Sequence, residues 1–496
     1  RTFGDNTCLT DGETGAVYSY AQFNECVDKR ATFLSRLGVS KGERFATLTR
    51  NCPEFFFLYL ASLKVGALII PLVVDLPVEA LTAHLERFQA RAVFYGAEAE
   101  DSVRGVAAGT VPSLLHAIPI RSLTEAVASL VPDTSLYHGV TLDDPGSIYF
   151  SSGTTGQPKG IPHTPRNLLA ASRSLADAYG FTEKDTQMGV LPCYHTALAM
   201  YGFWPGIWRG SNFVLFERFH KSMFWENIAR HRAAFVEVVP TILAMLLNPA
   251  EDVSARDLGS LRFIGCGSAP LATNLQDRFE RTFGIRVANQ YGLSEAAPTH
   301  FNPPDPRERR EGSIGRAIPV CEVRVVDETG RELSPGTAGE IIMRGDNVIA
   351  GYYGDAAESR AAFQDGWFYT GDLGYRDADG FYFLSGRKKE MINRGGFKIS
   401  PLSIDNVLLA LPGIREAAAV GVPDPIYGEE VVAFVAWTGA ASLSEDDIRA
   451  HCGRYLTPAE CPKKIFFIDE VPKTASGKIM RRALLERYHM ITTRNA

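Results

Sequence analysis

The sequence predicts an α/β fold with more than one domain. Strand-like and helix-like stretches alternate up to about residue 300, a pattern typical of parallel βαβ units. From about Gly312 the pattern becomes strand-rich, and residues 390–496 mix short strands with helices as a small α+β unit. A chain of 496 residues is also too long for one compact core, so two or more domains are expected.

The first part of the chain carries the alternation most clearly. Ser19 and Gln22 have the spacing of a capping box, which predicts a helix that runs to Leu37 and stops at Gly38. Apolar and β-branched runs then predict further elements in order: strands at Arg44–Thr49, Ala67–Val74 and Ala92–Tyr95, with helices at Glu54–Val65 and Ala80–Gln89.

A glycine-rich loop follows the predicted strand Ile148–Phe150. Glycines let backbone N–H groups approach an anion closely, hydroxyl groups add donors, and a lysine adds positive charge. These features suit a polyphosphate site, and a plain surface loop is the alternative interpretation that the residues alone leave open. The loop is not a Walker A motif, because Gly160 stands where that motif has Ser or Thr after its lysine. Its residues are Ser151, Ser152, Gly153, Thr154, Thr155, Gly156 and Lys159.

Three more segments in the first 300 residues place polar or small residues just after predicted strands. The stretch Leu191–His195 ends in a histidine, which by itself is more often a surface or core residue. The predicted strand Leu261–Ile264 ends in small residues that leave room for a ligand. The strand Ile285–Ala288 leads into Asn289–Glu295, where an aromatic ring, an amide and a carboxylate could contact a base and Mg²⁺.

Three short motifs stand out in the later part of the chain. Asp372 follows a predicted glycine turn and could accept hydrogen bonds from two ribose hydroxyls, or could simply cap a loop. Gly395 and Gly396 lie between two strand-like flanks. Pro472–Lys478 is a loop that ends in a lysine.

Together, these motifs and their order closely resemble the adenylate-forming superfamily, which contains acyl- and aryl-CoA synthetases, peptide-synthetase adenylation domains and luciferases. The resemblance runs from Ser147 to Lys478, and the pair of glycines makes it strongest for the CoA ligases. Two departures are visible. Ser294 replaces the usual threonine but keeps the hydroxyl, and Leu402-Ser403-Ile404-Asp405 stands where the family commonly has x-Glu-Ile-Glu, which leaves the first acidic position in doubt.

The resemblance implies a domain division. Residues 1–388 would form a large domain of parallel βαβ-type sheets packed with helices, plus a distorted β-barrel-like subdomain. Residues 389–496 would form a small mobile α+β domain that rotates about Lys389. Gly395 and Gly396 would line a channel for the thiol of CoA.

It also implies a set of site residues. Lys478, Thr155, Glu295 and His195 would be catalytic, with Glu295 and Thr155 holding Mg²⁺. The acid would lie against His195, Ala197, Tyr201, Gly265 and Gly267. ATP would be bound by Ser151, Ser152, Gly153, Thr154, Thr155, Gly156, Lys159, Ser268, Ala269, Pro270, Asn289, Gln290, Tyr291, Gly292, Ser294, Asp372, Arg387 and Lys478.

The implied reaction joins a carboxylic acid to a thiol in two steps. The carboxylate attacks the α-phosphate of ATP to give acyl-AMP and pyrophosphate, and the thiol of CoA then displaces AMP. No acidic residue lies in Tyr194–Tyr201, where amino-acid-activating members carry an aspartate, so an aryl, arylacrylic or medium-chain acid is expected. Transfer to a carrier-protein phosphopantetheine or to an amine is the alternative, and a silent nucleotide-binding scaffold or a luciferase-like oxidation are further ones.

Composition narrows the function further. The net charge of −6 gives no electrostatic reason to expect nucleic-acid binding. None of the eight cysteines forms a CxxC pair or a cluster with zinc spacing, so reduced thiols are expected. No apolar run is long enough to span a membrane, and a cytoplasmic enzyme is expected. The oligomeric state is left open.

Overall fold

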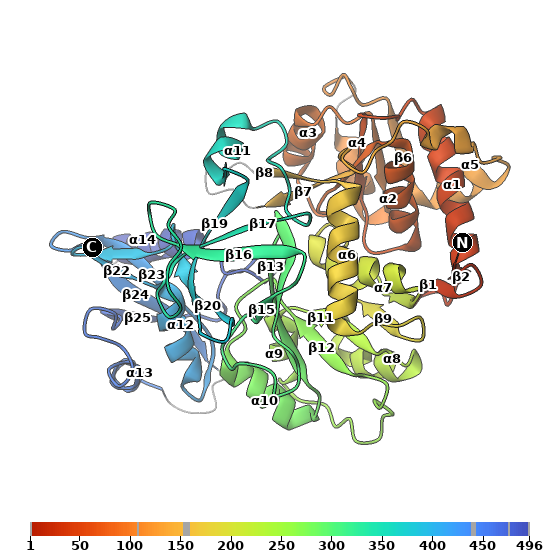
Figure 1. Cartoon of the computed structure of the whole chain (residues 1–496). Coiled ribbons are helices and arrows are strands. Elements are labelled where there is room, and N and C mark those ends of the chain that lie inside the picture. Colours follow the sequence, from red (N-terminus) through yellow and green to blue (C-terminus); the bar gives the residue numbers. More distant parts are fainter. Residues whose placement is uncertain (1, 107–108, 152–158, 438–442, 475–476, 495–496) are drawn as a thin grey trace.

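The computed structural model describes residues 2–106, 109–151, 159–437, 443–474 and 477–494. Two large sheets form the N-terminal part (Figure 1). The first sheet has, in spatial order, β15 (Arg316–Ala317), β14 (Ala296–Phe301), β13 (Val287–Leu293), β12 (Phe263–Cys266), β11 (Phe235–Val238), β9 (Thr186–Gly189), β10 (Asn212–Leu215), β1 (Thr7–Asp11) and β2 (Val17–Ser19). The second has β6 (His116–Pro119), β5 (Ala92–Tyr95), β3 (Arg44–Leu48), β4 (Leu68–Pro71), β7 (Ser147–Ser151) and β8 (Lys159–His163).

The central strands of both sheets are parallel. Strands β1, β10, β9, β11, β12 and β13 pair in parallel, as do β6, β5, β3, β4 and β7, while the edges carry antiparallel partners. Parallel strands need crossover helices, and these supply the layers around the sheets. In an open parallel sheet, the carboxyl ends of the strands are where ligands bind.

One hydrophobic core joins the two sheets through three helices. Buried side chains of α1 (Tyr20–Arg36), α2 (Pro53–Val65) and α6 (Pro165–Tyr179) belong to the same cluster as side chains of both sheets. Figure 1 shows α6, in yellow, passing beside both sheets. The remaining helices of this part are α3 (Val78–Arg87), α4 (Glu100–Gly105), α5 (Leu123–Ala128), α7 (Trp204–Arg209), α8 (Phe224–Arg230), α9 (Pro240–Leu246) and α10 (Thr273–Phe283), together with the π-helix η4 (Leu198–Phe203).

A third sheet follows, and all its pairings are antiparallel. It has its own small core, to which Val323, Ile341 and Phe368 contribute. Register shifts in β19 and its neighbours bend the sheet, as expected where a bulge interrupts a ladder. Its elements are β16 (Cys321–Val326), β17 (Gly339–Gly345), β18 (Phe363–Gln364), β19 (Trp367–Arg376), β20 (Tyr382–Arg387) and the helix α11 (Ala356–Ala362).

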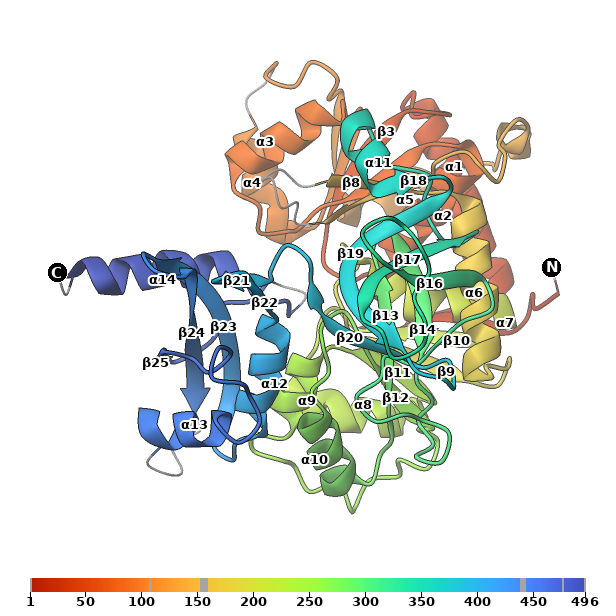
Figure 2. The ribbon, with the colours of Figure 1, turned by 60° about the vertical axis from the view of Figure 1, so that its left-hand side comes forward.

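The C-terminal part is a separate sheet with helices around it. Figure 2 shows it in blue to one side of the rest of the molecule. A buried ion pair ties its two ends together: Arg481 Nη2 lies 2.6 Å from Asp405 Oδ2, and Asp405 Oδ1 accepts from the backbone of Ala419 at 2.6 Å. Its elements are β21 (Ile392–Arg394), β22 (Phe397–Ile399), α12 (Pro401–Ala410), β23 (Ile414–Asp424), β24 (Gly428–Trp437), α13 (Glu445–Cys452), β25 (Lys464–Phe467) and α14 (Arg481–Arg494).

The fold class predicted from the sequence is confirmed, and many element boundaries agree closely. The capping box of Ser19 and Gln22 is present at the start of α1. The acidic residue Asp405, at the position where the family pattern was only partly matched, is buried in α12 and has a structural partner. The eight cysteines are all free. Among the described residues, no helix is long and apolar enough to cross a membrane.

Two local predictions were wrong. The strand predicted at Ile285–Ala288 was placed too early and too short, because β13 begins at Val287, continues through Leu293 and forms a hairpin with β14. Asp372 does not follow a turn: Gly371, at φ 72°, lies inside β19, so the strand continues through a left-handed glycine. The domain boundary at residues 388 and 389 lies between the last strand of the third sheet and β21, and it stays a prediction.

The Asp405–Arg481 pair predicts a large loss of stability when one partner is removed. Asp405→Ala leaves Arg481 buried with only Glu390, 2.9 Å from its Nε, as counter-charge. We expect the free energy of unfolding to fall by about 3 kcal/mol. In the matched control Glu445→Ala, which breaks an exposed pair with Arg449, the loss should stay below about 1 kcal/mol. Chemical denaturation of both variants measures the difference, and equal effects would contradict the role of the pair.

Candidate active site

One pocket collects most of the residues that the sequence singled out. It lies beyond the carboxyl ends of β12 and β13 and is closed by a loop from the C-terminal part. The sequence prediction missed three residues of its lining: Thr196 and Leu293, which adjoin predicted residues directly, and Ala297, which lies two positions after Glu295. The other lining residues were all predicted: His195, Ala197, Tyr201, Ser268, Gly292, Ser294 and Lys478.

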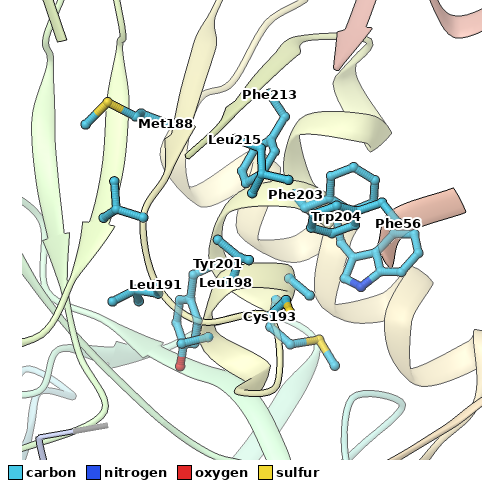
Figure 3. Close-up of a cluster of buried hydrophobic side chains, with 14 of the residues drawn as sticks. Phe56, Met188, Leu191, Cys193, Leu198, Tyr201, Phe203, Trp204, Phe213 and Leu215 are labelled. Atoms are coloured by element: carbon cyan, nitrogen blue, oxygen red, sulfur yellow. The ribbon is translucent and has the colours of Figure 1, made fainter. Parts of the chain in front are cut away.

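The wall with Tyr201 is shaped by an irregular helix. Residues Leu198–Phe203 form a π-helix, a widened turn that often occurs at functional sites. Figure 3 shows Phe203 and Trp204 packed in the buried cluster with Phe56, while the hydroxyl of Tyr201 points away from Phe56. Gly292 makes room for that hydroxyl, since a Cβ on Gly292 would lie 2.5 Å from it.

His195 is neutral in the pocket. Burial and the nearby charge of Lys478 lower the pKa of His195 to about 3. Its Nδ1 accepts a hydrogen bond from the backbone N–H of Ala197 at 3.2 Å. The neutral ring therefore carries its proton on Nε2, which is the atom left to donate to a ligand oxygen.

A buried carboxylate with two partners lies on the strand β19. Asp372 is 3% exposed, and its Oδ2 accepts from the hydroxyl of Tyr291 at 2.5 Å. Its Oδ1 lies 2.8 Å from Arg387 Nε. Burial raises the pKa of Asp372, while Arg387 and the Tyr291 hydroxyl act in the opposite direction. The ring of Tyr291 itself packs edge-on against His300.

Lys478 brings the C-terminal part into this pocket. The backbone around it is held by hydrogen bonds with Thr474, whose N–H donates to the Lys478 carbonyl at 2.8 Å. Gly477, at φ 79°, lies against Thr241 at the start of α9. Burial and Arg387 lower the pKa of Lys478, whereas Glu295 and Asp372 raise it. Lys478 is therefore the cation that faces two carboxylates at this site.

Glu295 and Lys159 are linked through one tyrosine. The hydroxyl of Tyr352 donates to Glu295 Oε1 at 3.1 Å, and Lys159 Nζ lies 4.5 Å from the centre of the Tyr352 ring. Lys159 is also paired with Glu358 of α11. The parts of the chain that the structure describes hold no group of three or more metal-binding side chains. One carboxylate such as Glu295 nevertheless suits Mg²⁺, which usually takes one or two carboxylates together with phosphate oxygens and water.

The strand ends beside the pocket hold the remaining residues predicted to bind the nucleotide. Ser268 has a left-handed backbone, φ 66°, which is unusual for a residue other than glycine and typical of functional sites. Ala269 and Pro270 follow it at the surface. Asn289 Nδ2 donates to the carbonyl of Ser313 at 2.8 Å. The His163 ring bonds the carbonyl of Ser294 at 2.8 Å.

The structure shows a buried carboxylate near the pocket that the sequence interpretation overlooked. Glu237 of β11 lies directly across from Gly265 of β12. A Cβ at Gly265 would lie 2.1 Å from Glu237 Oε2 and from Gln290 Nε2, so Gly265 makes room for both side chains. The amide of Gln290 is therefore engaged below the pocket, with Glu237 and with Tyr179.

Some predicted residues cannot be placed. Ser152, Gly153, Thr154, Thr155 and Gly156 lie outside the described residues, and Ser151 is placed only as the last residue of β7.

The predicted channel residues lie in the C-terminal part. Gly395 and Gly396 form the turn between β21 and β22, both with positive φ. The positive φ angles of this turn favour glycine, so the turn itself accounts for both glycines whether or not they also line a channel. Lys389 is exposed just before this hairpin. Arg394, which precedes this turn, lies on the Tyr427 ring and pairs with Glu430.

A lysine from a small C-terminal part shares one pocket with a neutral histidine and lies near the charges of Glu295 and Asp372, which is the arrangement expected of the adenylate-forming class of ligases. Residues 1–353 match the family of AMP-binding enzymes, and residues 403–478 match the AMP-binding enzyme C-terminal domain. The chain therefore belongs to the AMP-binding enzyme family. This confirms the predicted superfamily and the enzyme class of AMP-forming acid–thiol ligases, with ATP, Mg²⁺ and CoA as the expected cofactors.

Relatives cover nearly the whole chain. It is 38% identical over 459 residues to the sulfoacetate–CoA ligase of Cupriavidus necator, covering 90% of this chain and 88% of that one. It is 32% identical to the oxalate–CoA ligase of Arabidopsis thaliana, covering 95% and 93%. Its structure is similar to that of ATP-bound MatB from Rhodopseudomonas palustris, with a TM-score of 0.90, 29% identity and coverage of 98% and 96%.

The neutral state of His195 predicts how activity depends on pH. Because its pKa is lowered to about 3, His195 stays unprotonated at any pH above about 4 and cannot produce an acid limb near neutrality. We expect His195→Asn to lower the rate of pyrophosphate release with the carboxylic acid substrate by about a hundredfold, because the Nε2–H donor is lost. The shape of the profile of rate against pH between about pH 5 and 8 should not change. An acid limb in the native enzyme that disappears in the variant would contradict this assignment.

Proposed function

We propose that this enzyme uses ATP to convert a carboxylic acid to acyl-AMP and pyrophosphate, and then transfers the acyl group to the thiol of CoA with release of AMP. The observation that carries the proposal is the position of Lys478. This lysine comes from the C-terminal part, yet it lies in the same pocket as His195 and near the charges of Glu295 and Asp372.

The first step brings two anions together. A carboxylate is ionised at neutral pH, so the step needs no strong base but does need positive charge and fixed donors. Lys478 would bridge the carboxylate and the α-phosphate oxygens, neutralising their repulsion. His195 Nε2–H would donate to an oxygen of the acid, as its neutral state supports.

The nucleotide contacts are proposed for the residues around the same pocket. Asp372, already fixed by Tyr291 and Arg387, would accept the ribose hydroxyls. Ser268, Ala269, Pro270, Asn289 and Gly292 would surround adenine, and Gln290 would contribute only its main chain, because its amide is engaged with Tyr179 and Glu237. Lys159 and the glycine-rich loop would hold the β- and γ-phosphates. Glu295 and Thr155 would hold Mg²⁺, which offsets phosphate charge when bound.

The second step requires Lys478 to leave. Rotation of residues 389–496 about Lys389 would remove it and bring the hairpin with Gly395 and Gly396 to the pocket. A glycine pair lets a pantetheine arm pass close to the backbone. A CoA acceptor is supported by the relatives named as CoA ligases; a carrier-protein phosphopantetheine is the alternative acceptor. A cytoplasmic location, where ATP and CoA are available, completes the proposal.

The acid itself is proposed from the pocket walls. Ala197, Tyr201, Leu293 and Ala297 give the pocket an apolar and aromatic lining. Such walls suit an aryl, arylacrylic or medium-chain acid.

Lys478→Ala should separate the two half-reactions. Without the bridging cation, acyl-AMP formation should fall by at least about a thousandfold, whereas transfer from supplied acyl-AMP to CoA should stay within about threefold of the native rate. Pyrophosphate release measures the first reaction, and AMP release from acyl-AMP and CoA measures the second. Equal loss of both would reject the assignment of Lys478 to the first step only.

Gly396→Trp should have the opposite effect. Apart from Gly396 and its two chain neighbours, no atom of the described residues lies within 4 Å of a Cβ at Gly396, so an indole there would project into open space and obstruct a passing thiol arm. We expect acyl-AMP formation to remain and CoA transfer to fall by about a hundredfold or more. Gly366→Trp is the matched control, because Gly366 also has a positive φ and open space around it but lies in the turn between β18 and β19. Normal CoA turnover in Gly396→Trp would refute the channel.

A further inference from the structure

Glu237 is a buried acidic residue for which the proposed chemistry has no use. It is 4% exposed, in the middle of the apolar strand β11. Burying a carboxylate costs several kcal/mol unless hydrogen bonds or a cation compensate it. A group on the bound substrate is one way to compensate such a carboxylate when it lies near the substrate pocket.

Only one of its two carboxylate oxygens is satisfied. Gln290 Nε2 donates to Oε2 at 2.9 Å, and the Tyr179 hydroxyl donates to the other end of the Gln290 amide. This chain of bonds fixes the orientation of the Glu237 carboxylate. Oε1 has no hydrogen-bond partner among the described residues.

The unsatisfied oxygen lies toward the pocket. A Cβ on Gly267 would be 3.3 Å from Oε1, and Gly267 is followed directly by Ser268, which lines the pocket. The charge of Glu237 also acts on Tyr201, another lining residue, and raises the pKa of its hydroxyl together with burial. The oxygen thus lies close to Gly267, the residue that precedes Ser268 of the pocket lining.

No cation of the described chain compensates this carboxylate. Burial raises the pKa of Glu237 well above its ordinary value, opposed only by the bond from Gln290. Within the described lining of the pocket, Lys478 is the one cationic side chain, and the reacting carboxylate requires it. The described lining of the pocket therefore carries one cation, and the nearby Glu237 carboxyl group has an oxygen without a hydrogen-bond partner among the described residues.

We propose that Glu237 selects acids that carry a cationic nitrogen, an ammonium or trimethylammonium group, at the end remote from the reacting carboxylate. The inference rests on the proposed function and narrows its substrate. The carboxylate of such an acid would face Lys478, and its cation would supply the counter-charge that Glu237 lacks, with a hydrogen bond to Oε1 where the cation is an ammonium group. The Tyr201 ring would add an aromatic face, which attracts cations. The apolar walls would contact the body between the two charges.

The test uses acids of matched shape. 4-(Trimethylammonio)butanoate and 5,5-dimethylhexanoate differ only in replacement of a cationic nitrogen by carbon, and 5-aminopentanoate, hexanoate and hexanedioate form a cationic, neutral and anionic series. Acid-dependent pyrophosphate release gives kcat/KM for each acid with the native enzyme, Glu237→Gln and Glu183→Gln. Glutamine keeps the size of Glu237 and an acceptor for Gln290, while Glu183 is an exposed glutamate whose replacement changes the same charge far from the pocket.

We expect the native enzyme and Glu183→Gln to favour the cationic member of each pair by about tenfold or more. Glu237→Gln should lose about a hundredfold in kcat/KM with the cationic acids while staying within about threefold with the neutral ones, which also shows that the variant is folded. A native preference for the neutral or anionic members, or an unchanged preference in Glu237→Gln, would overturn the inference and leave the proposed function intact. Release with none of these or any other acid would instead overturn the proposed function.

Discussion

The charge balance around Lys478 is the constraint on which the site depends. A lysine in a buried pocket is disfavoured in its charged form, and Arg387 nearby adds to the cost. Glu295 and Asp372 offset that cost without removing it, because the pKa of Lys478 stays below its ordinary value. The phosphates of ATP would add the missing negative charge, so the lysine is held best when the nucleotide is present. Once pyrophosphate has left, less negative charge would hold Lys478 in the pocket.

The C-terminal part is suited to such a reversible contact. It has its own sheet, its own hydrophobic cluster and the buried pair of Asp405 and Arg481, none of which depends on the pocket for its contacts. Its contacts with the rest of the chain include a hydrogen bond from Asn274 to the Leu409 carbonyl and the packing of Gly477 against Thr241. Breaking these few small contacts between the C-terminal part and the rest of the chain would cost little free energy, as the proposed rotation requires.

The sequence predicted the elements whose signals are local. The capping box of α1 and the left-handed glycines after α2 and α6 can be recognised from neighbouring residues alone. The extension of β13 could not, because its partner β14 makes the strand, and a single-sequence pattern does not reveal the partner. Gly371 was interpreted as a turn because glycine usually marks one, whereas here two neighbouring strands hold it in β19.

The same distinction explains which site residues were found. Lys478, Asp372 and Glu295 lie in short motifs of polar residues, which stand out in any chain. Glu237 lies inside an apolar strand, where the sequence gives no sign of a site. Only the structure shows that Gly265, Gln290 and Tyr179 surround it. The prediction of an acid without a basic group rested on the absence of an acidic residue near His195 in the sequence. Since that residue can come from a neighbouring strand, its absence from one segment does not exclude a cationic substrate.

A bound cationic nitrogen would favour the charged form of Glu237, and opposite charges at the two ends of the acid would then constrain how it enters the pocket. An acid with a carboxylate and a cationic nitrogen is oriented by both ends, because the reversed placement sets like charges against Lys478 and Glu237. A neutral acid loses only the attraction to Glu237, while a dianionic acid places a second carboxylate against an unsatisfied acceptor. The enzyme would then discriminate between acids by the end remote from the reacting atoms. The adenylation chemistry at Lys478 could therefore remain the same across relatives that act on different acids.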